Sequence, residues 1–194
     1  MPKLRVNEVF YSLQGEGARK GSANIFVRFA HCNMECRFCD TEFESFRELS
    51  VEELLEECSR FRCKNIIFTG GEPLLQLTTR IVKALKSSGY YLGIETNGTI
   101  VPPQGLDWIT VSPKVAEHVL AKTFRRVHVN ELKYVRNKSQ GIPRPTVKAD
   151  LYYISPEFDG DYPDIDNIRH CIGLVMENPR WRLSLQEHKL LKIR

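Results

Sequence analysis

Short apolar segments with the character of strands recur along the whole chain, and helical segments lie between several of them. The strand-like segments cover residues 5–11, 25–29, 65–68, 91–95, 108–111, 128–134, 151–154 and 182–185. Helices are expected at 51–61, 77–87 and 165–177. A strand, a crossover helix and a parallel strand pack as a right-handed unit. The alternation therefore predicts an α/β fold built on a parallel sheet.

The length of the chain limits how that sheet closes. A complete barrel of eight strand–helix units usually needs about 250 residues, and this chain has 194. We therefore expect a shortened, open TIM-like barrel, formed by a single domain over residues 1–194. Residues 138–148 contain two prolines, a glycine and no apolar period, so we expect a loop there rather than a linker between domains.

Composition and charge favour a globular protein that acts on a small molecule. Hydrophobic residues make up 42% of the chain, enough for one substantial core. The formal net charge of +4 comes from scattered basic residues, which does not identify a nucleic-acid-binding protein. No apolar stretch approaches the ~20 residues that span a bilayer, and the N-terminal residues do not resemble a signal peptide. We expect a cytoplasmic protein without a membrane or nucleic-acid partner.

Three of the six cysteines, Cys32, Cys36 and Cys39, lie in one loop directly after the strand-like segment 25–29. This places them at the C-terminal edge of the sheet, where α/β folds carry their sites. A cytosolic setting disfavours disulfides, so metal binding is the better interpretation. Three thiolates are one ligand short of closing a tetrahedral zinc site or a cubane cluster, and the adjacent His31 is poorly spaced to be the fourth. We expect an open coordination position at this centre.

The other cysteines, and three motifs that follow predicted strands, complete the set of candidates. Cys58, Cys63 and Cys171 are expected to be buried small apolar residues rather than ligands. The motifs are Thr69-Gly70-Gly71-Glu72-Pro73, Glu95-Thr96-Asn97-Gly98 and Ser112-Pro113-Lys114. Paired glycines at the end of a strand let a ligand approach the main chain closely. Taken singly, these motifs are also compatible with ordinary turns or the end of a strand.

The spacing CxxxCxxC, with Phe38 before the last cysteine, resembles the signature of the radical S-adenosylmethionine (SAM) superfamily. The resemblance implies a [4Fe–4S] cluster on the three cysteines, SAM chelating the open iron, and reductive cleavage of SAM to a 5′-deoxyadenosyl radical. It also implies an open barrel of the radical SAM type. The residues that it places beside SAM are Phe38, Asp40, Gly71, Glu72, Asn97, Ser112 and Lys114.

Further motifs resemble one family within that superfamily, the 7-carboxy-7-deazaguanine synthases. They are FYSLQGEG at 10–17, CDT at 39–41, ETNG at 95–98, SPK at 112–114 and SLQEHK at 184–189. The resemblance implies a lyase that converts 6-carboxy-5,6,7,8-tetrahydropterin to 7-carboxy-7-deazaguanine with loss of ammonia, in queuosine and 7-deazapurine biosynthesis. It also implies an electron donor such as a flavodoxin, and a homodimer.

The same resemblance implies which residues meet the substrate. They are Leu13, Gln14, Gly15, Glu16, Arg28, Thr69, His188 and the C-terminal carboxylate of Arg194. Residue chemistry agrees, since Gln14 and Glu16 can pair with the donors and acceptors of a pterin edge, and Arg28 can fork onto a carboxylate. The alternatives, which have less weight in this context, are that Arg28 forms only a surface ion pair and that Gln14-Gly15 is only a turn.

Thr41 matches the hydroxyl that holds Mg²⁺ in this family, where the ion bridges protein and substrate carboxylate. Mg²⁺ is seldom held by an all-protein cage, so one side-chain oxygen is chemically reasonable. His31 is a departure, because the family commonly has glycine before the first cysteine.

Two other functions remain open on the sequence. One is a radical SAM activase that installs a glycyl radical on a partner protein, because such activases share the cysteine spacing. The other is a non-catalytic iron–sulfur or zinc module. FYSLQGEG, Thr41 and SLQEHK count against the activase, and reductive SAM cleavage would exclude the module.

Overall fold

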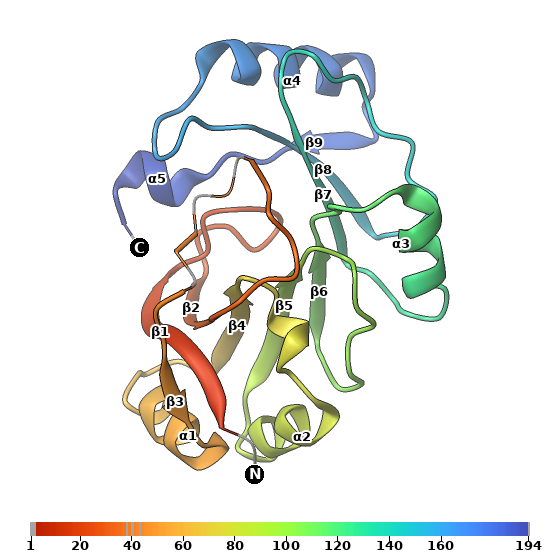
Figure 1. Ribbon diagram of the computed structural model, residues 1–194. Coiled ribbons are helices and arrows are strands. Elements are labelled where there is room, and N and C mark those ends of the chain that lie inside the picture. The colour runs from red at the N-terminus through yellow and green to blue at the C-terminus, as the bar shows by residue number, and fades with distance from the viewer. Residues whose placement is uncertain (1–2, 38, 40, 43, 194) are drawn as a thin grey trace.

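The computed structural model describes residues 3–37, 39, 41–42 and 44–193, and Figure 1 shows how its helices and strands are arranged. The strands are β1 (Leu4–Leu13), β2 (Ala23–Phe29), β3 (Arg47–Leu49), β4 (Asn65–Gly70), β5 (Tyr91–Thr96), β6 (Trp108–Val111), β7 (Glu131–Arg136), β8 (Leu151–Pro156) and β9 (Trp181–Leu183). The helices are α1 (Val51–Ser59), the 3₁₀ turn η1 (Pro73–Leu75), α2 (Thr79–Ser87), α3 (Glu117–Thr123), α4 (Ile165–Glu177) and α5 (Glu187–Leu191).

All nine strands form one open sheet, in the order β3-β1-β2-β4-β5-β6-β7-β8-β9. Every neighbouring pair from β2 to β9 is parallel. In the described part of the chain, no pairing joins the edge strands β3 and β9, so the sheet does not close. The expected shortened, open barrel of an α/β protein is therefore confirmed.

The N-terminal edge of the sheet differs from the expected all-parallel arrangement. β1 is antiparallel to both β2 and β3, and Glu8 lies opposite Arg28 in the register. β1 and β2 are joined by a hairpin loop over residues 14–22. A short hairpin connection requires antiparallel strands, whereas a parallel pair needs a crossover of a dozen or more residues. The expectation of parallel pairing was therefore wrong for this edge.

Local signals placed several helix ends correctly. Ser50 caps α1: its hydroxyl accepts from the Glu53 N–H at 3.1 Å, and the Glu53 carboxylate accepts from the Ser50 N–H at 2.6 Å. α4 has the expected bounds, and residues 138–148 form a loop as predicted. α3, α5 and β3 were not predicted. No helix in the described residues has both the length and the apolar character needed to cross a bilayer.

The helices pack on the sheet through a continuous apolar core. Leu54 of α1, Leu85 of α2, Leu120 of α3 and Cys171 of α4 are all fully buried in it. Cys58 is also fully buried, so the prediction that Cys58 and Cys171 are core residues is confirmed; Cys63 is half-buried. Burial raises the pKa of the Cys58 thiol to about 12, as expected for a structural cysteine.

The hairpin loop 14–22 is anchored to the sheet by Glu131, at the start of β7. The Glu131 carboxylate accepts from the Ala18 N–H at 2.6 Å and from the Thr110 hydroxyl at 2.9 Å. Gly17 has φ +66°, and a Cβ there would lie 2.5 Å from Glu131 Oε2. Its N–H donates to the Ser184 hydroxyl at 3.0 Å. The loop is thereby tied to both β7 and the segment after β9.

A pair of glycine substitutions tests this anchor. Gly17 and Gly21 both have positive φ, but a Cβ at Gly21 would meet nothing within 4 Å. Both Gly17→Ala and Gly21→Ala carry the left-handed penalty of about 1–2 kcal/mol. Only Gly17→Ala displaces the buried Glu131, so the free energy of unfolding of this variant should be lower than that of Gly21→Ala by about 1–3 kcal/mol. Equal losses in chemical denaturation would show that Glu131 does not hold the loop.

Candidate functional site

Four neighbouring parallel strands, β2, β4, β5 and β6, end at one edge of the sheet, and each is followed by one of the predicted motifs. The cysteine loop follows β2, Gly71 and Glu72 follow β4, Asn97 follows β5, and Ser112 to Lys114 follow β6. Carboxyl ends of neighbouring parallel strands lie side by side, which is where open α/β sheets bind ligands. The structure thus brings these motifs together.

The three cysteine side chains line one cavity of about 200 Å³. Cys32 and Cys36 are half-buried and Cys39 is exposed; all three are free thiols. Burial, with the charges of Cys39 and Cys32, raises the pKa of Cys36, while Lys114 acts in the opposite direction. Among the described residues, no group of three or more His, Cys, Asp or Glu side chains is arranged so that it could hold a single metal ion. The three cysteines form part of the cavity wall.

Glu72 is the most buried acid of the site, with none of its surface exposed. Its carboxylate accepts from the N–H groups of Leu74 and Asn97, at 3.0 and 2.8 Å. The Thr96 hydroxyl lies 2.9 Å from each carboxylate oxygen. Burial raises the pKa of Glu72 against these hydrogen bonds. The carboxylate therefore joins the ends of β4 and β5, and Glu72 does not line the cavity of the cysteines.

Asn97 carries this connection on to the cysteine loop. Its side-chain amide donates to the Asn33 side-chain oxygen at 2.9 Å and lies 4.0 Å from Cys32 Sγ. Asn33 in turn donates to the Thr99 hydroxyl at 2.9 Å. The end of β5 therefore fixes the first part of the loop that bears the thiols.

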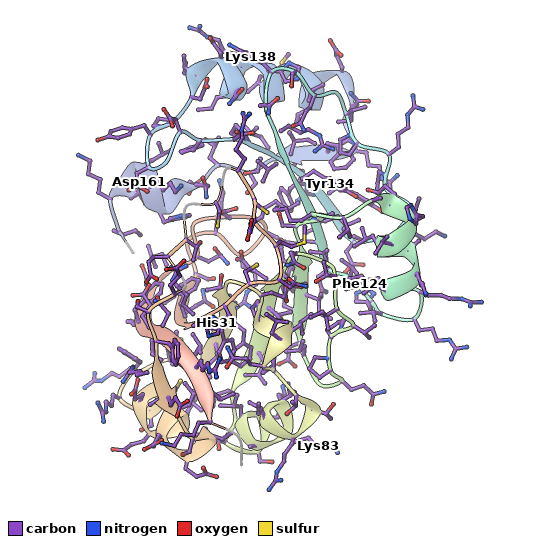
Figure 2. All side chains as sticks on the ribbon, viewed as in Figure 1. His31, Lys83, Phe124, Tyr134, Lys138 and Asp161 are labelled. Atoms are coloured by element: carbon purple, nitrogen blue, oxygen red, sulfur yellow. The ribbon has the colours of Figure 1, made fainter. Side chains whose placement is uncertain are left out.

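The backbone conformation at position 31 explains why a glycine is favourable before the first cysteine. Its φ is +69°, a left-handed conformation that costs a non-glycine residue roughly 1–2 kcal/mol. The His31 ring packs edge-on against Phe46 at 5.2 Å, and its Nε2 lies 3.2 Å from Arg5 Nη1. Figure 2 shows His31 beside β1. These contacts offset the backbone cost.

The main chain after β4 approaches the cysteine loop very closely. A Cβ at Gly71 would lie 1.9 Å from the His31 carbonyl oxygen, and the Glu72 N–H donates to that oxygen at 2.9 Å. No side chain fits between the two loops. Glycine at position 71 is therefore a steric requirement of this edge.

Ser112 and Lys114 also line this cavity. Lys114 Nζ donates to the Ser112 hydroxyl at 2.8 Å and lies 3.3 Å from its carbonyl oxygen. Burial, followed by repulsion from Lys133, lowers the pKa of Lys114 to about 8. A hydroxyl and a cation therefore line the same cavity as the thiols.

A second, larger cavity of about 1170 Å³ adjoins the first. Every predicted substrate residue in the described part of the chain lines it: Leu13, Gln14, Gly15, Glu16, Arg28, Thr69 and His188. Thr41 and Thr69 line both cavities. The two cavities therefore share a wall.

The larger cavity is completed by the C-terminal helix α5, which Figure 1 shows in blue beside the β1–β2 hairpin. The Glu187 N–H donates to the Gly15 carbonyl at 3.0 Å. A Cβ at Gly15 would lie 2.4 Å from His188 Nδ1. Residues from the two ends of the chain, predicted to share a function, are thereby brought into contact.

Arg28 lines the larger cavity and is also engaged within the protein. Its Nε donates to Glu8 Oε1 at 2.8 Å, and its guanidinium lies 5.6 Å from the centre of the Phe10 ring. The ion pair considered from the sequence therefore exists, and it leaves Arg28 on the cavity wall. Phe38, Asp40 and Arg194, also predicted site residues, lie outside the described residues.

Three charged residues of this region were not selected from the sequence. Glu95 lines both cavities and Lys133 lines the smaller one. Glu131 lines neither cavity, and its carboxylate accepts from the Ala18 N–H of the hairpin loop. Glu95 is the first residue of the ETNG motif, which was predicted to lie at the site, but only Asn97 of that motif was assigned a role. Lys133 follows Glu131 at the spacing that puts both on one face of a strand.

Known proteins match the chain over nearly all its length. A model of the radical SAM superfamily matches residues 26–137. A 7-carboxy-7-deazaguanine synthase from Bacteroides thetaiotaomicron is 36% identical over 190 residues, covering 98% of each chain. One from Haemophilus influenzae is 37% identical over 204 residues, covering 99% of this chain and 95% of its own. The chain belongs to the 7-carboxy-7-deazaguanine synthase family of radical SAM proteins.

A solved structure agrees with this assignment. The crystal structure of QueE from Escherichia coli matches with a TM-score of 0.76 and 27% identity, over 96% of this chain and 95% of its own. The smaller cavity also fits the cofactors of a radical SAM protein. Its lining includes three free thiols, a main-chain cradle without side chains at Gly70 and Gly71, and the polar groups of Ser112 and Lys114.

The close approach at Gly71 yields a test in this radical SAM protein. Gly71→Ala forces the main chain away from His31, so the free energy of unfolding should fall by about 2 kcal/mol or more. Iron content after anaerobic reconstitution should fall with it, because the displaced loop carries the thiols. Gly141→Ala is the control, since a Cβ there meets nothing within 4 Å. Parent-like iron content in Gly71→Ala would contradict the coupling of the two loops.

Proposed function

We propose that the chain is a 7-carboxy-7-deazaguanine synthase. It is a radical SAM lyase that converts 6-carboxy-5,6,7,8-tetrahydropterin to 7-carboxy-7-deazaguanine with loss of ammonia, in 7-deazapurine and queuosine biosynthesis. Full-length relatives of that name at 36–37% identity support the assignment. The observation that carries it is the pair of adjoining cavities, one lined by the three cysteines and the other by the polar groups that suit a carboxypterin.

The smaller cavity is assigned to the cofactors. Cys32, Cys36 and Cys39 would hold the [4Fe–4S] cluster, which when bound supplies the electron for reductive cleavage of SAM. Gly71 offers main-chain groups to SAM, and Asn97, Ser112 and Lys114 offer side-chain donors and acceptors. The contact of Glu72 with SAM stays a prediction, because its carboxylate is already held by Thr96, Leu74 and Asn97.

The larger cavity is assigned to the carboxypterin. Gln14, Glu16 and the main chain of Leu13 and Gly15 would pair with the polar edge of the ring. Arg28, held at Nε by Glu8, would offer its two Nη groups to the carboxylate in a bidentate fork. Thr69 and His188, and the terminal carboxylate of Arg194, are further substrate contacts in this proposal.

Mg²⁺ is proposed at Thr41, whose side chain lies where the two cavities meet. One hydroxyl, the substrate carboxylate and water form a reasonable oxygen set for this ion. The physiological reductant is proposed to be a flavodoxin-like donor, because Cys39 is exposed and leaves the cluster position accessible from the surface. The homodimer that the family resemblance implies is proposed on that ground alone.

The lining of the larger cavity favours a small polar substrate over the peptide segment of a glycyl-radical partner. Gln14, Glu16 and Arg28 provide a few polar and charged groups in one cavity, as suits a bicyclic ring with a carboxylate. An activase requires an open groove for a chain segment, and here α5 lies across the hairpin.

One assay tests the function. The reconstituted protein, with SAM, a reductant, Mg²⁺ and the carboxypterin under anaerobic conditions, should yield 7-carboxy-7-deazaguanine. Cys32→Ala, Cys36→Ala and Cys39→Ala should each abolish cluster binding and product, because no local thiolate replaces the lost ligand. Cys63→Ala is the control and should keep both. SAM cleavage without the deazapurine would favour another radical SAM reaction, and absence of SAM cleavage would favour a non-catalytic module.

Substitutions at Thr41 test the proposed Mg²⁺ ligand. Thr41→Ser keeps the hydroxyl and should retain most of the stimulation by Mg²⁺. Thr41→Val keeps the shape without the oxygen and should lose that stimulation, as should Thr41→Ala. Turnover is measured with and without Mg²⁺ at matched cluster content. An undiminished Mg²⁺ response in Thr41→Val would remove Thr41 from the ligand set.

A further inference from the structure

A buried cation lies between two carboxylates at the place where the cavities adjoin. Lys133 projects from β7, and only 8% of its side-chain surface is exposed. Its Nζ lies 2.5 Å from Glu16 Oε2 and 3.5 Å from Glu95 Oε2. Glu16 comes from the β1–β2 hairpin and Glu95 from β5. One ammonium group therefore joins three separate elements of the fold.

Both carboxylates are also held at their second oxygen. Gln14 Nε2 donates to Glu95 Oε1 at 2.9 Å, and Gln186 Nε2 lies 3.5 Å from Glu16 Oε1. Glu16 and Glu95 line both cavities. A carboxylate has about four lone-pair sites. These contacts leave each group with acceptor capacity on the cavity side.

Electrostatics explain why a cation is required at this point. Burial raises the pKa of Glu95, but the charge of Lys133 and the hydrogen bond from Gln14 outweigh it and hold the pKa below its usual value. Burial lowers the pKa of Lys133, and the charges of Glu16 and Glu95 more than compensate. Two carboxylates in a shared, partly desolvated site repel each other unless a cation lies between them.

We propose that Lys133 is a positioning residue for substrate recognition, which holds Glu16 and Glu95 side by side so that both accept hydrogen bonds from the N–H-rich edge of the bound heterocycle. The inference rests on the proposed function. It assigns the selectivity for an aminopyrimidine ring to a Glu–Lys–Glu arrangement rather than to Glu16 alone. Lys133 itself is turned toward the carboxylates and does not need to touch the substrate.

A purely structural Lys133 would have different consequences. Its loss would then lower stability or cluster content, with no specific effect on the substrate. A positioning role instead predicts a change in the KM for the carboxypterin that exceeds any change in the Kd for SAM, because Lys133 contacts Glu16 and Glu95, which line the larger cavity. The KM for the carboxypterin should depend on the charge at position 133 rather than on the shape of the side chain.

The test compares Lys133→Met and Lys133→Arg with the parent holoenzyme at matched cluster content. Lys133→Met should raise the KM for the carboxypterin by about tenfold or more, with kcat within about threefold of the parent and a smaller change in the Kd for SAM than in that KM. Lys133→Arg keeps the charge and should recover most of that KM. Lys86→Met removes the exposed Lys86–Asp107 ion pair, 2.7 Å long, and serves as the control with parent kinetics.

A parent-like KM in Lys133→Met, or a KM in Lys133→Arg as high as in Lys133→Met, overturns the inference. If Lys133→Met does not fold, the double variant Glu16→Gln/Lys133→Met removes both charges of the closest pair, which is less destabilising than leaving one unpaired. Its KM should exceed that of Glu16→Gln, because Glu95 loses its partner; equal values overturn the inference. A parent that forms no deazapurine overturns the proposed function, and the inference falls with it.

Discussion

The buried carboxylate of Glu72 is the constraint on which the cofactor side of this protein depends. The carboxylate accepts hydrogen bonds from Thr96 and Asn97 at the end of β5. The main-chain N–H of Glu72 donates to the His31 carbonyl oxygen, just before the first cysteine. A buried acid is costly unless its oxygens are satisfied. Satisfying Glu72 therefore fixes three chain segments against one another, and the position of the thiols follows from that packing.

The substrate side depends on contacts between residues far apart in the sequence. The β1–β2 hairpin is tied to β7 through Glu131 and Lys133, and to the C-terminal segment through Ser184 and Glu187. Neither the hairpin nor α5 forms a cavity wall alone. The larger cavity therefore exists only when the whole sheet has assembled. This arrangement couples substrate binding to the complete fold.

Local patterns were sufficient for the parallel part of the fold and for most of the motifs. The segments predicted at 65–68, 91–95 and 108–111 lie within β4, β5 and β6, because short apolar runs between turn residues are typical of buried parallel strands. Periodicity does not reveal the direction of pairing, so the antiparallel β1 and the Glu8–Arg28 register required the structure. α5 is too short to show a helical period. Lys133 reads as one polar residue of a strand, and only the folded sheet places it between Glu16 and Glu95.

The central claim is that three protein thiolates leave one iron of the cluster open for SAM. Electron paramagnetic resonance of the dithionite-reduced holoprotein, recorded with and without SAM, tests it most directly. Chelation at the open iron changes the ligand field of the cluster, so the account predicts a clear change in the g values of the reduced cluster when SAM is added. Identical spectra at saturating SAM would contradict the account, because they would show a cluster whose coordination SAM does not enter.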